Sequence, residues 1–111
     1  MNVKLIPSEE FLRRFKLLAK KYRSIGDDYR TLKESLLENP FLGESLGGGV
    51  RKIRMAIGSK GKGKSGGARV LTLAVLVSGD ADVTLLTIYD KEEIDNVSDN
   101  YIKWLVNKAR R

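Results

Sequence analysis

The chain has 111 residues, a net charge of +7 and 41% hydrophobic residues, which is enough for one domain with a modest core. It contains no cysteine, which excludes disulfides and thiolate metal sites, and no histidine, the commonest general acid–base residue. The longest apolar run, residues 70–77, is far shorter than the ~20 residues that span a bilayer. We expect a single domain over residues 1–111, in the cytoplasm and away from membranes.

The first part of the chain predicts a short strand followed by two helices. Residues 2–6 are apolar enough for an edge strand, and Ser8 is placed to cap a helix. Apolar side chains then recur at the spacing of one helical face, at Phe11, Phe15, Leu18 and Tyr22. We expect Gly26 to end this helix and Asp27 or Asp28 to cap the next one, which gives an αα-hairpin.

The second part of the chain predicts strands and a final helix. Residues 41–49 are expected to be a glycine-rich loop, and three strands are expected over 50–57, 68–77 and 83–89. The strand over 68–77 is apolar on both faces, which is typical of a central position. Ser98 is placed to cap the last helix. The pattern indicates an α+β domain with helices on one side of a small, mainly antiparallel sheet.

One segment, residues 49–69, concentrates the positive charge. It has no acidic residue, and its seven cations equal the net charge of the whole chain. These cations are Arg51, Lys52, Arg54, Lys60, Lys62, Lys64 and Arg69. In an extended strand Lys52 and Arg54 lie on the face opposite Ile53. A segment of one sign creates a local positive field, so RNA or DNA is the expected partner.

Residues 58–65, GSKGKGKS, match the phosphate-binding loop of nucleotide hydrolases letter for letter. That motif requires a helix directly after the serine, because the helix N-terminus forms part of the phosphate cradle. Here two glycines and a β-branched strand follow instead. We therefore interpret the segment as a flexible basic loop whose lysines contact a nucleic-acid backbone.

The acidic and aromatic residues of the second half allow two interpretations each. The carboxylates at positions 80, 82, 90, 92, 93 and 95 could bind a metal, but turn chemistry and solubility are the favoured roles. Tyr89 ends a strand and either packs at the core rim or presents its hydroxyl to a phosphate or base. Trp104 is interpreted as a packing residue.

Three segments together resemble the RelE/HigB family of bacterial toxin–antitoxin systems, with the closest similarity to its HigB-type branch. They are residues 49–54, residues 60–70 and residues 86–93, in this order and spacing. The resemblance implies a microbial-ribonuclease-like RelE domain that cleaves messenger RNA, usually in the ribosomal A site. It also implies an antitoxin partner, commonly one with a helix-turn-helix domain.

The resemblance and the charge pattern together suggest site residues. Catalytic positions are Lys52, Arg54, Arg69, Tyr89 and Lys91, and RNA or ribosome contacts are Arg51, Lys60, Lys62 and Lys64. The family's classical branch has a further arginine where Glu92 stands, and a tyrosine near the start of the last helix where residues 96–98 have none. Tyr89 or Tyr101 could replace that tyrosine.

The expected reaction needs no metal or cofactor. The 2′-hydroxyl of the RNA attacks the adjacent phosphate, Lys52 acts as the base, and the arginines stabilise the transition-state charge. Tyr89 or Lys91 protonates the leaving oxygen. Two alternatives remain: a nucleic-acid-binding module without catalysis, and an inactive toxin that binds only its antitoxin.

Overall fold

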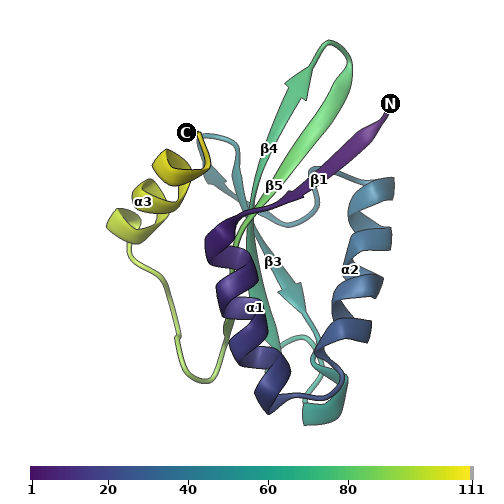
Figure 1. The fold of residues 1–111 in the computed structure, drawn as a ribbon, viewed down its shortest axis with the longest axis vertical. Coiled ribbons are helices and arrows are strands. Elements are labelled where there is room, and N and C mark those ends of the chain that lie inside the picture. The colour runs from purple at the N-terminus through teal and green to yellow at the C-terminus, as the bar shows by residue number, and fades with distance from the viewer. Residues whose placement is uncertain (111) are drawn as a thin grey trace.

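The computed structural model describes residues 1–110, which form a five-stranded sheet with three α-helices (Figure 1). The strand order is β1-β5-β4-β3-β2, and within these residues only the β1–β5 pair is parallel. The elements are β1 (Val3–Pro7), α1 (Glu9–Lys21), α2 (Ile25–Glu38), β2 (Glu44–Gly47), β3 (Val50–Met55), the 3-10 helix η1 (Gly58–Lys60), β4 (Ala68–Val77), β5 (Asp80–Asp90) and α3 (Asp99–Ala109). The predicted α+β class and mainly antiparallel sheet are confirmed.

The first helix begins where the sequence predicts, whereas the second begins earlier. The Ser8 hydroxyl accepts a hydrogen bond from a first-turn backbone N–H, so Ser8 caps α1. Ser24 occupies the N-cap position of α2, and Gly26 lies inside the helix. The prediction that Gly26 separates the helices and that Asp27 or Asp28 caps the second is therefore wrong. A helical glycine costs only about 1 kcal/mol, which the buried face of α2 offsets.

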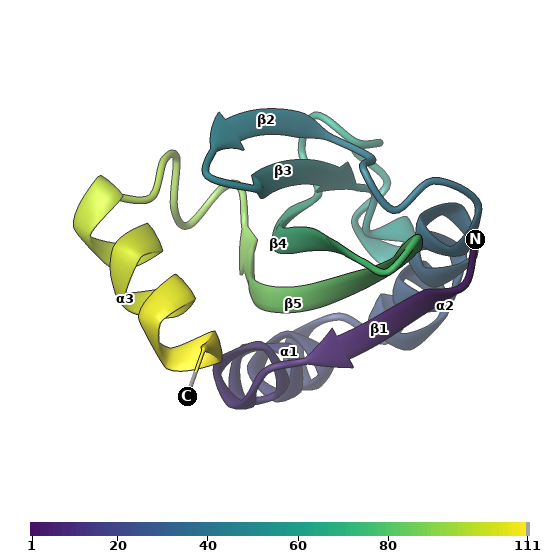
Figure 2. The same ribbon diagram turned by 90° about the horizontal axis from the view of Figure 1, so that it is seen from above.

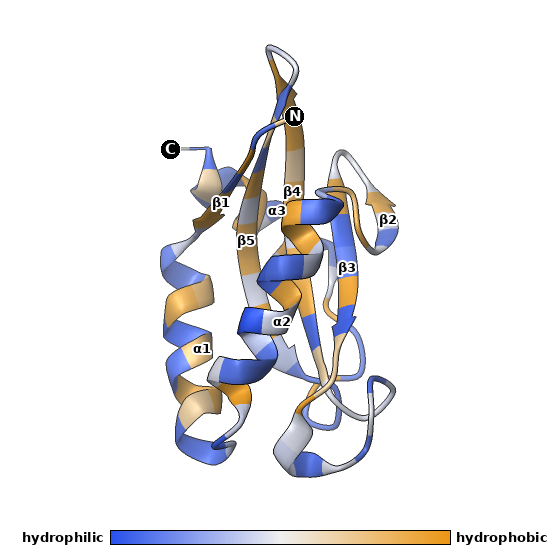
Figure 3. Cartoon of the chain, turned by 90° about the vertical axis from the view of Figure 1, so that its right-hand side faces the viewer, coloured by the Kyte–Doolittle hydropathy of each residue, from blue (hydrophilic) through white to orange (hydrophobic). Residues whose placement is uncertain are grey.

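Both faces of the sheet are covered, whereas the sequence predicted helices on one side only. Figure 2 shows α3 on the side of the sheet away from α2. The α1 and α2 helices share one core with the inward side chains of the strands, including Phe11, Leu36, Ile53, Val70 and Ile88. The α3 helix forms a second core on the other face with Leu71, Leu73, Leu86 and Leu105. Because β4 and β5 are apolar on both sides (Figure 3), one layer of helices cannot bury them.

Residues 41–49, predicted to be a loop, contain the short edge strand β2. It pairs with β3 so that Glu44 lies opposite Lys52 and its last residue, Gly47, lies opposite Val50, and the turn between the two strands consists of Gly48 and Gly49. All three glycines have positive φ, a conformation that costs other residues strain. Four residues are too few to show a clear alternation of apolar and polar side chains, which is why this strand was missed. The β2–β3 hairpin forms one wall of a cavity whose other wall is α3.

Candidate active site

The register of three neighbouring strands aligns three of the predicted site residues. Arg69 of β4 lies opposite Arg54 of β3 on one side and opposite Tyr89 of β5 on the other. Lys52 lies one row further along β3 on the same face, two residues from Arg54. Side chains two residues apart on a strand point to the same face, so Leu71 shares a face with Arg69. Because Leu71 belongs to the core under α3, this row lies on the α3 side of the sheet.

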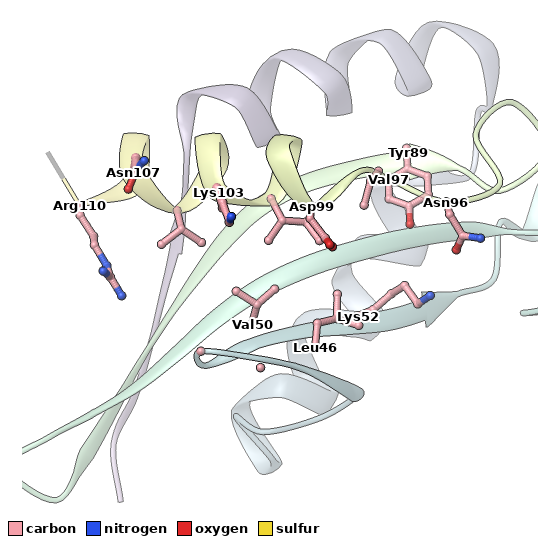
Figure 4. Close-up of a pocket in the computed structure, with 14 residues that line it drawn as sticks. Leu46, Val50, Lys52, Tyr89, Asn96, Val97, Asp99, Lys103, Asn107 and Arg110 are labelled. Atoms are coloured by element: carbon pink, nitrogen blue, oxygen red, sulfur yellow. The ribbon is translucent and has the colours of Figure 1, made fainter.

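A cavity of about 770 Å³ opens between α3 and the β2–β3 hairpin, beside this row (Figure 4). The sheet supplies Lys52 and Tyr89 to its wall, and the segment before α3 supplies Asn96 and Val97. The rest of the wall comes from the hairpin and from one flank of α3, with Leu46, Val50, Asp99, Ile102, Lys103, Val106, Asn107 and Arg110. The cavity therefore joins predicted catalytic residues to a polar stripe that sequence reasoning did not identify.

Tyr89 is buried, and its hydroxyl group has no hydrogen-bond partner among the described residues. Burial raises the pKa of this phenol, and the positive charge of Arg69 offsets only part of that effect. The hydroxyl therefore stays protonated near neutral pH and can donate a hydrogen bond or a proton. Tyr89 belongs to the core under α3, as the packing interpretation predicted, and it also lines the cavity.

Arg69 is 5% exposed and holds the neighbouring loop. Its guanidinium donates hydrogen bonds to the backbone carbonyls of Lys64 at 2.9 Å, Ser65 at 3.2 Å and Ala68 at 3.1 Å. Such donors satisfy carbonyls that a tight loop would otherwise leave unpaired. Arg69 is thus a fixed positive charge within the row rather than a mobile surface residue.

Arg54 differs from Arg69 because it is exposed, and the described residues offer it no hydrogen-bond or salt-bridge partner. It lines a surface cavity of about 380 Å³ together with Lys52 and Lys64. The Lys52 ammonium lies 3.9 Å from the Glu44 carboxylate, its partner across the hairpin. These three cations come from two segments and meet at the rim of the sheet, where an anionic ligand can reach them.

Lys91, predicted to be catalytic, lies just beyond the end of β5. Its backbone N–H donates to the carbonyl of Gly67, and its ammonium pairs with the Asp95 carboxylate. The strong pairing lowers the pKa of Asp95. The structure thus places Lys91 next to the loop but with its charge matched by a neighbouring carboxylate.

Lys60, predicted to contact RNA, is a buried ion-pair partner. Its ammonium lies 2.8 Å from the Asp90 carboxylate and 2.7 Å from that of Glu92, and its side chain is 8% exposed. Asp90 is 1% exposed and also accepts hydrogen bonds from the Tyr22 hydroxyl at 2.5 Å and the Glu92 backbone N–H at 3.0 Å. The expected turn role of Asp90 is confirmed by the bond from the Glu92 N–H, whereas the expected solubility role is wrong, because a buried carboxylate requires these partners.

The pKa values of Lys60 and Asp90 shift in opposite directions. Burial opposes the charge on Lys60, but hydrogen bonds to Asp90 and Glu92 outweigh it and raise the pKa of Lys60 far above its usual value. Burial likewise opposes the charge on Asp90, yet hydrogen bonds from Lys60 and Tyr22 lower its pKa. Both groups are therefore charged over the whole neutral range.

The remaining residues predicted to contact RNA are Lys62 and Lys64 in the loop and Arg51 on β3. Lys62 pairs with Glu92 at 3.2 Å and stays 58% exposed, and Lys64 is exposed at the tip. Arg51 donates a hydrogen bond to the Gly43 carbonyl at 3.0 Å and lies over the Phe41 ring. It therefore holds the segment before β2 and points away from the row of Arg54.

Side chains of α2 also hold the start of the loop. The Asp28 carboxylate accepts hydrogen bonds from the backbone N–H of Gly58, and the Ser24 hydroxyl accepts one from that of Ser59. The expected flexible loop is thus tied at its beginning, at Lys60 and at its end by Arg69. No sequence motif announces this, because the anchors lie 30 or more residues away from Gly58 and Lys60.

Tyr101, the second tyrosine considered as a proton donor, belongs to a different cluster. Its hydroxyl donates to the Glu10 carboxylate at 2.9 Å and lies 3.0 Å from the Thr87 hydroxyl. Glu10 is 8% exposed and also accepts two hydrogen bonds from Arg13. This cluster joins α1, β5 and α3, so Tyr101 holds α3 in place. Trp104 stacks on Tyr101 and remains 44% exposed, which fits a partial packing role.

The described residues contain no group of three or more acidic side chains arranged to hold a metal ion. Within residues 1–110, no helix has the length and apolar character needed to cross a membrane.

Comparisons with known proteins identify the fold. A search of protein-family models finds no match. Among solved structures, the chain is similar to the toxin RelE of E. coli in the free state, in a variant with two arginines replaced by alanine. The TM-score is 0.60 at 15% sequence identity, and the match covers 96% of this chain and 97% of that chain. The chain therefore has a RelE-like fold, as the sequence resemblance predicted.

Proposed function

We propose that this protein is the toxin of a toxin–antitoxin system and inhibits translation by cutting messenger RNA on the ribosome. The observation that carries the proposal is the aligned row of Arg54, Arg69 and Tyr89, with Lys52 beside it, next to the cavity of about 770 Å³ that Lys52 and Tyr89 line. The similarity of the whole chain to the toxin RelE supports it. The partner is an antitoxin, of helix-turn-helix type if the HigB-like resemblance holds, and the site of action is the cytoplasm.

The proposed reaction uses the RNA's own 2′-hydroxyl as nucleophile, which restricts the activity to RNA. The exposed Arg54 binds the scissile phosphate, because its planar guanidinium can hold two phosphate oxygens and stays charged. Arg69 adds a fixed positive charge beside it on the neighbouring strand, which favours the extra negative charge of the transition state. Lys52, as the neutral amine, takes the proton of the 2′-hydroxyl and becomes an ammonium, which the Glu44 carboxylate 3.9 Å away then pairs.

The leaving 5′-oxygen needs a proton, and Tyr89 is the best placed donor. Its hydroxyl lines the cavity, is protonated near neutral pH and has no partner among the described residues to lose. Lys91 is the second candidate, although it must first leave Asp95. Lys62 and Lys64 bind flanking phosphates or ribosomal RNA, whereas Lys60 acts indirectly by holding the loop.

The experiment that tests this function adds the purified protein to a cell-free translation reaction and maps messenger RNA ends by primer extension. The same RNA without ribosomes serves as the parallel sample. Cuts only on translated RNA support a ribosome-dependent endonuclease, and cuts on naked RNA support a free ribonuclease instead. The Arg54→Ala variant should lose the cuts, while Lys4→Ala, an exposed cation on β1, should keep them.

A second candidate is a protein that binds nucleic acid or its antitoxin without catalysis. One observation favours it: Arg69 and Lys60 are both occupied by contacts within the protein. Binding alone predicts a gradual and additive loss of affinity as surface lysines are removed. Catalysis predicts an abrupt loss at one or two positions. Absence of cuts with a folded protein would favour this second function.

A further inference from the structure

The cavity between α3 and the β2–β3 hairpin contains a buried donor that the protein itself does not use. Tyr89 is 3% exposed, and its hydroxyl lies at the cavity wall without a partner among the described residues. A buried donor that stays unpaired costs about 1–3 kcal/mol, so such groups are normally satisfied by a ligand or water. Figure 4 shows the hydroxyl of Tyr89 directed toward the space that Lys52 and Asn96 also border.

One flank of α3 faces the same space with polar groups. Asp99, Lys103, Asn107 and Arg110 follow one another at intervals of four, four and three residues and all line the cavity (Figure 4). Apolar side chains provide the walls, with Val50 and Leu46 on the hairpin side and Val97, Ile102 and Val106 on the helix side. A slot with apolar walls and a few polar groups at its rim suits a flat, aromatic ligand.

The charges at the slot fit a nucleotide. Lys52, Lys103 and Arg110 outnumber the single carboxylate of Asp99, so the slot attracts an anion. Its volume of about 770 Å³ is within the range of small-molecule sites, about 300–1,000 Å³. Lys52 of β3 lines the slot, so a base can enter the slot while its phosphate stays over β3.

We propose that this slot binds one base of the RNA and that Asn96 and Asp99 determine which base is accepted. The proposal rests on the proposed function, because it places the cleaved phosphate at Lys52 and Arg54. A carboxylate accepts hydrogen bonds but does not donate them, so Asp99 favours bases with an exocyclic amino group. The Asn96 amide can both donate and accept, which suits adenine in particular. Uracil is disfavoured, because its one donor, the N3–H, lies between two carbonyl oxygens that the carboxylate repels.

The first test measures binding and does not depend on cleavage. Adenosine, cytidine, guanosine and uridine 5′-monophosphates are titrated into the labelled protein, and backbone amide shifts are followed by NMR, with inorganic phosphate as the reference. We expect the three amino-bearing nucleotides to shift the amides of Val50, Val97 and Asp99 at lower concentration than uridine monophosphate. Equal shifts with all four nucleotides, shifts reproduced by phosphate alone, or no shifts at the slot at millimolar concentrations would overturn the proposal.

The second test uses the variant Asp99→Asn, in which an amide that both donates and accepts replaces a carboxylate that only accepts. The preference against uridine monophosphate should fall at least about fivefold, because the amide can donate to a uracil carbonyl. Asp82→Asn, the same change on β5 away from the slot, should leave the preference unchanged. An unchanged preference in Asp99→Asn would exclude a role in base selection.

Mapped cut sites separate this inference from the proposed function. If the wild-type protein cuts RNA and Asp99→Asn cuts at a different distribution of bases, both stand. If the wild type cuts and Asp99→Asn keeps the same distribution, the function stands and the base-selecting role fails. If the wild type does not cut, the function fails, and the NMR titration alone decides whether the slot binds a base.

Discussion

Arg54 and Arg69 lie directly opposite each other on neighbouring strands, yet their surroundings differ completely. Arg54 is exposed and meets no anionic group among the described residues, whereas Arg69 is buried and donates to three backbone carbonyls. The loop repeats this contrast, since Lys60 is paired inside the protein and Lys64 is exposed. The charge of a basic segment is therefore divided: part of it is paired inside the protein, and part of it stays exposed on the surface.

The largest effect should follow from breaking the buried pair of Lys60 and Asp90. Asp90→Asn leaves the Lys60 ammonium with only the half-exposed Glu92 carboxylate, 2.7 Å away, as counter-charge, and breaking a buried pair typically costs about 3–5 kcal/mol of stability. Chemical denaturation measures this loss. Lys64→Met, the matched change at the exposed end of the loop, should alter the free energy of unfolding by less than about 0.5 kcal/mol.

A double variant separates the pair's net contribution from the penalty of an unpaired charge. In Lys60→Met with Asp90→Leu both charges are absent, and such replacements are often neutral or stabilising. We expect the double variant to be more stable than Asp90→Asn alone. If the double variant were the less stable of the two, the ion pair itself would be the main source of stability.

The next largest effect should be the loss of activity in Arg54→Ala. Removing one charge-stabilising donor typically costs about 10²–10³ in rate, and the exposed position of Arg54 predicts an unchanged unfolding free energy. In Arg69→Ala we expect a similar rate loss together with a loss of stability, because loop carbonyls lose their donors. Rates come from primer extension and stabilities from denaturation. A stable and fully active Arg54→Ala variant would contradict the assignment of the phosphate-binding residue.

The buried pair of Lys60 and Asp90 also predicts how stability depends on pH. The folded-state pKa of Asp90 is lowered, so its contribution is present above its unfolded pKa of about 4 and is lost as the pH falls further. The folded-state pKa of Lys60 is raised, so its contribution is present below about pH 10 and is lost only in stronger alkali. Relative to the apolar double variant, the wild type should therefore lose stability below pH 4. A stability difference that is constant between pH 7 and pH 3 would refute this.

The sequence predicted the fold well because its signals are local. The Ser8 cap, the apolar face of the first helix and the two-sided apolar strand over 68–77 each depend on neighbours in the sequence, and all are confirmed. The positions of Arg54, Arg69 and Tyr89 on one row also follow from strand pairing. Strand β2 was missed because four exposed residues bury too little to leave a pattern.

The partners of the charged groups could not be predicted. Asp90 reaches Lys60 and Tyr22 across 30 and 68 residues, and Glu10 reaches Tyr101 across 91. Long-range pairs of this kind are set by tertiary packing, so a lysine in the sequence looks the same whether it ends up buried or exposed. The polar flank of α3 was missed for a related reason, because a charged helix face is usually solvated and only the hairpin opposite turns it into a cavity wall.

The smallest expected effect compares Lys62 with Lys64 in RNA binding. Each phosphate contact with single-stranded nucleic acid contributes about 0.7 to the slope of log affinity against log salt. Lys64→Ala should reduce that slope by about this amount, whereas Lys62→Ala should reduce it less, because Glu92 at 3.2 Å already neutralises part of its charge. Filter binding of an RNA oligomer at several salt concentrations measures both slopes. Equal reductions would mean that Lys62 leaves Glu92 when RNA binds, and that the loop tip acts as one unit.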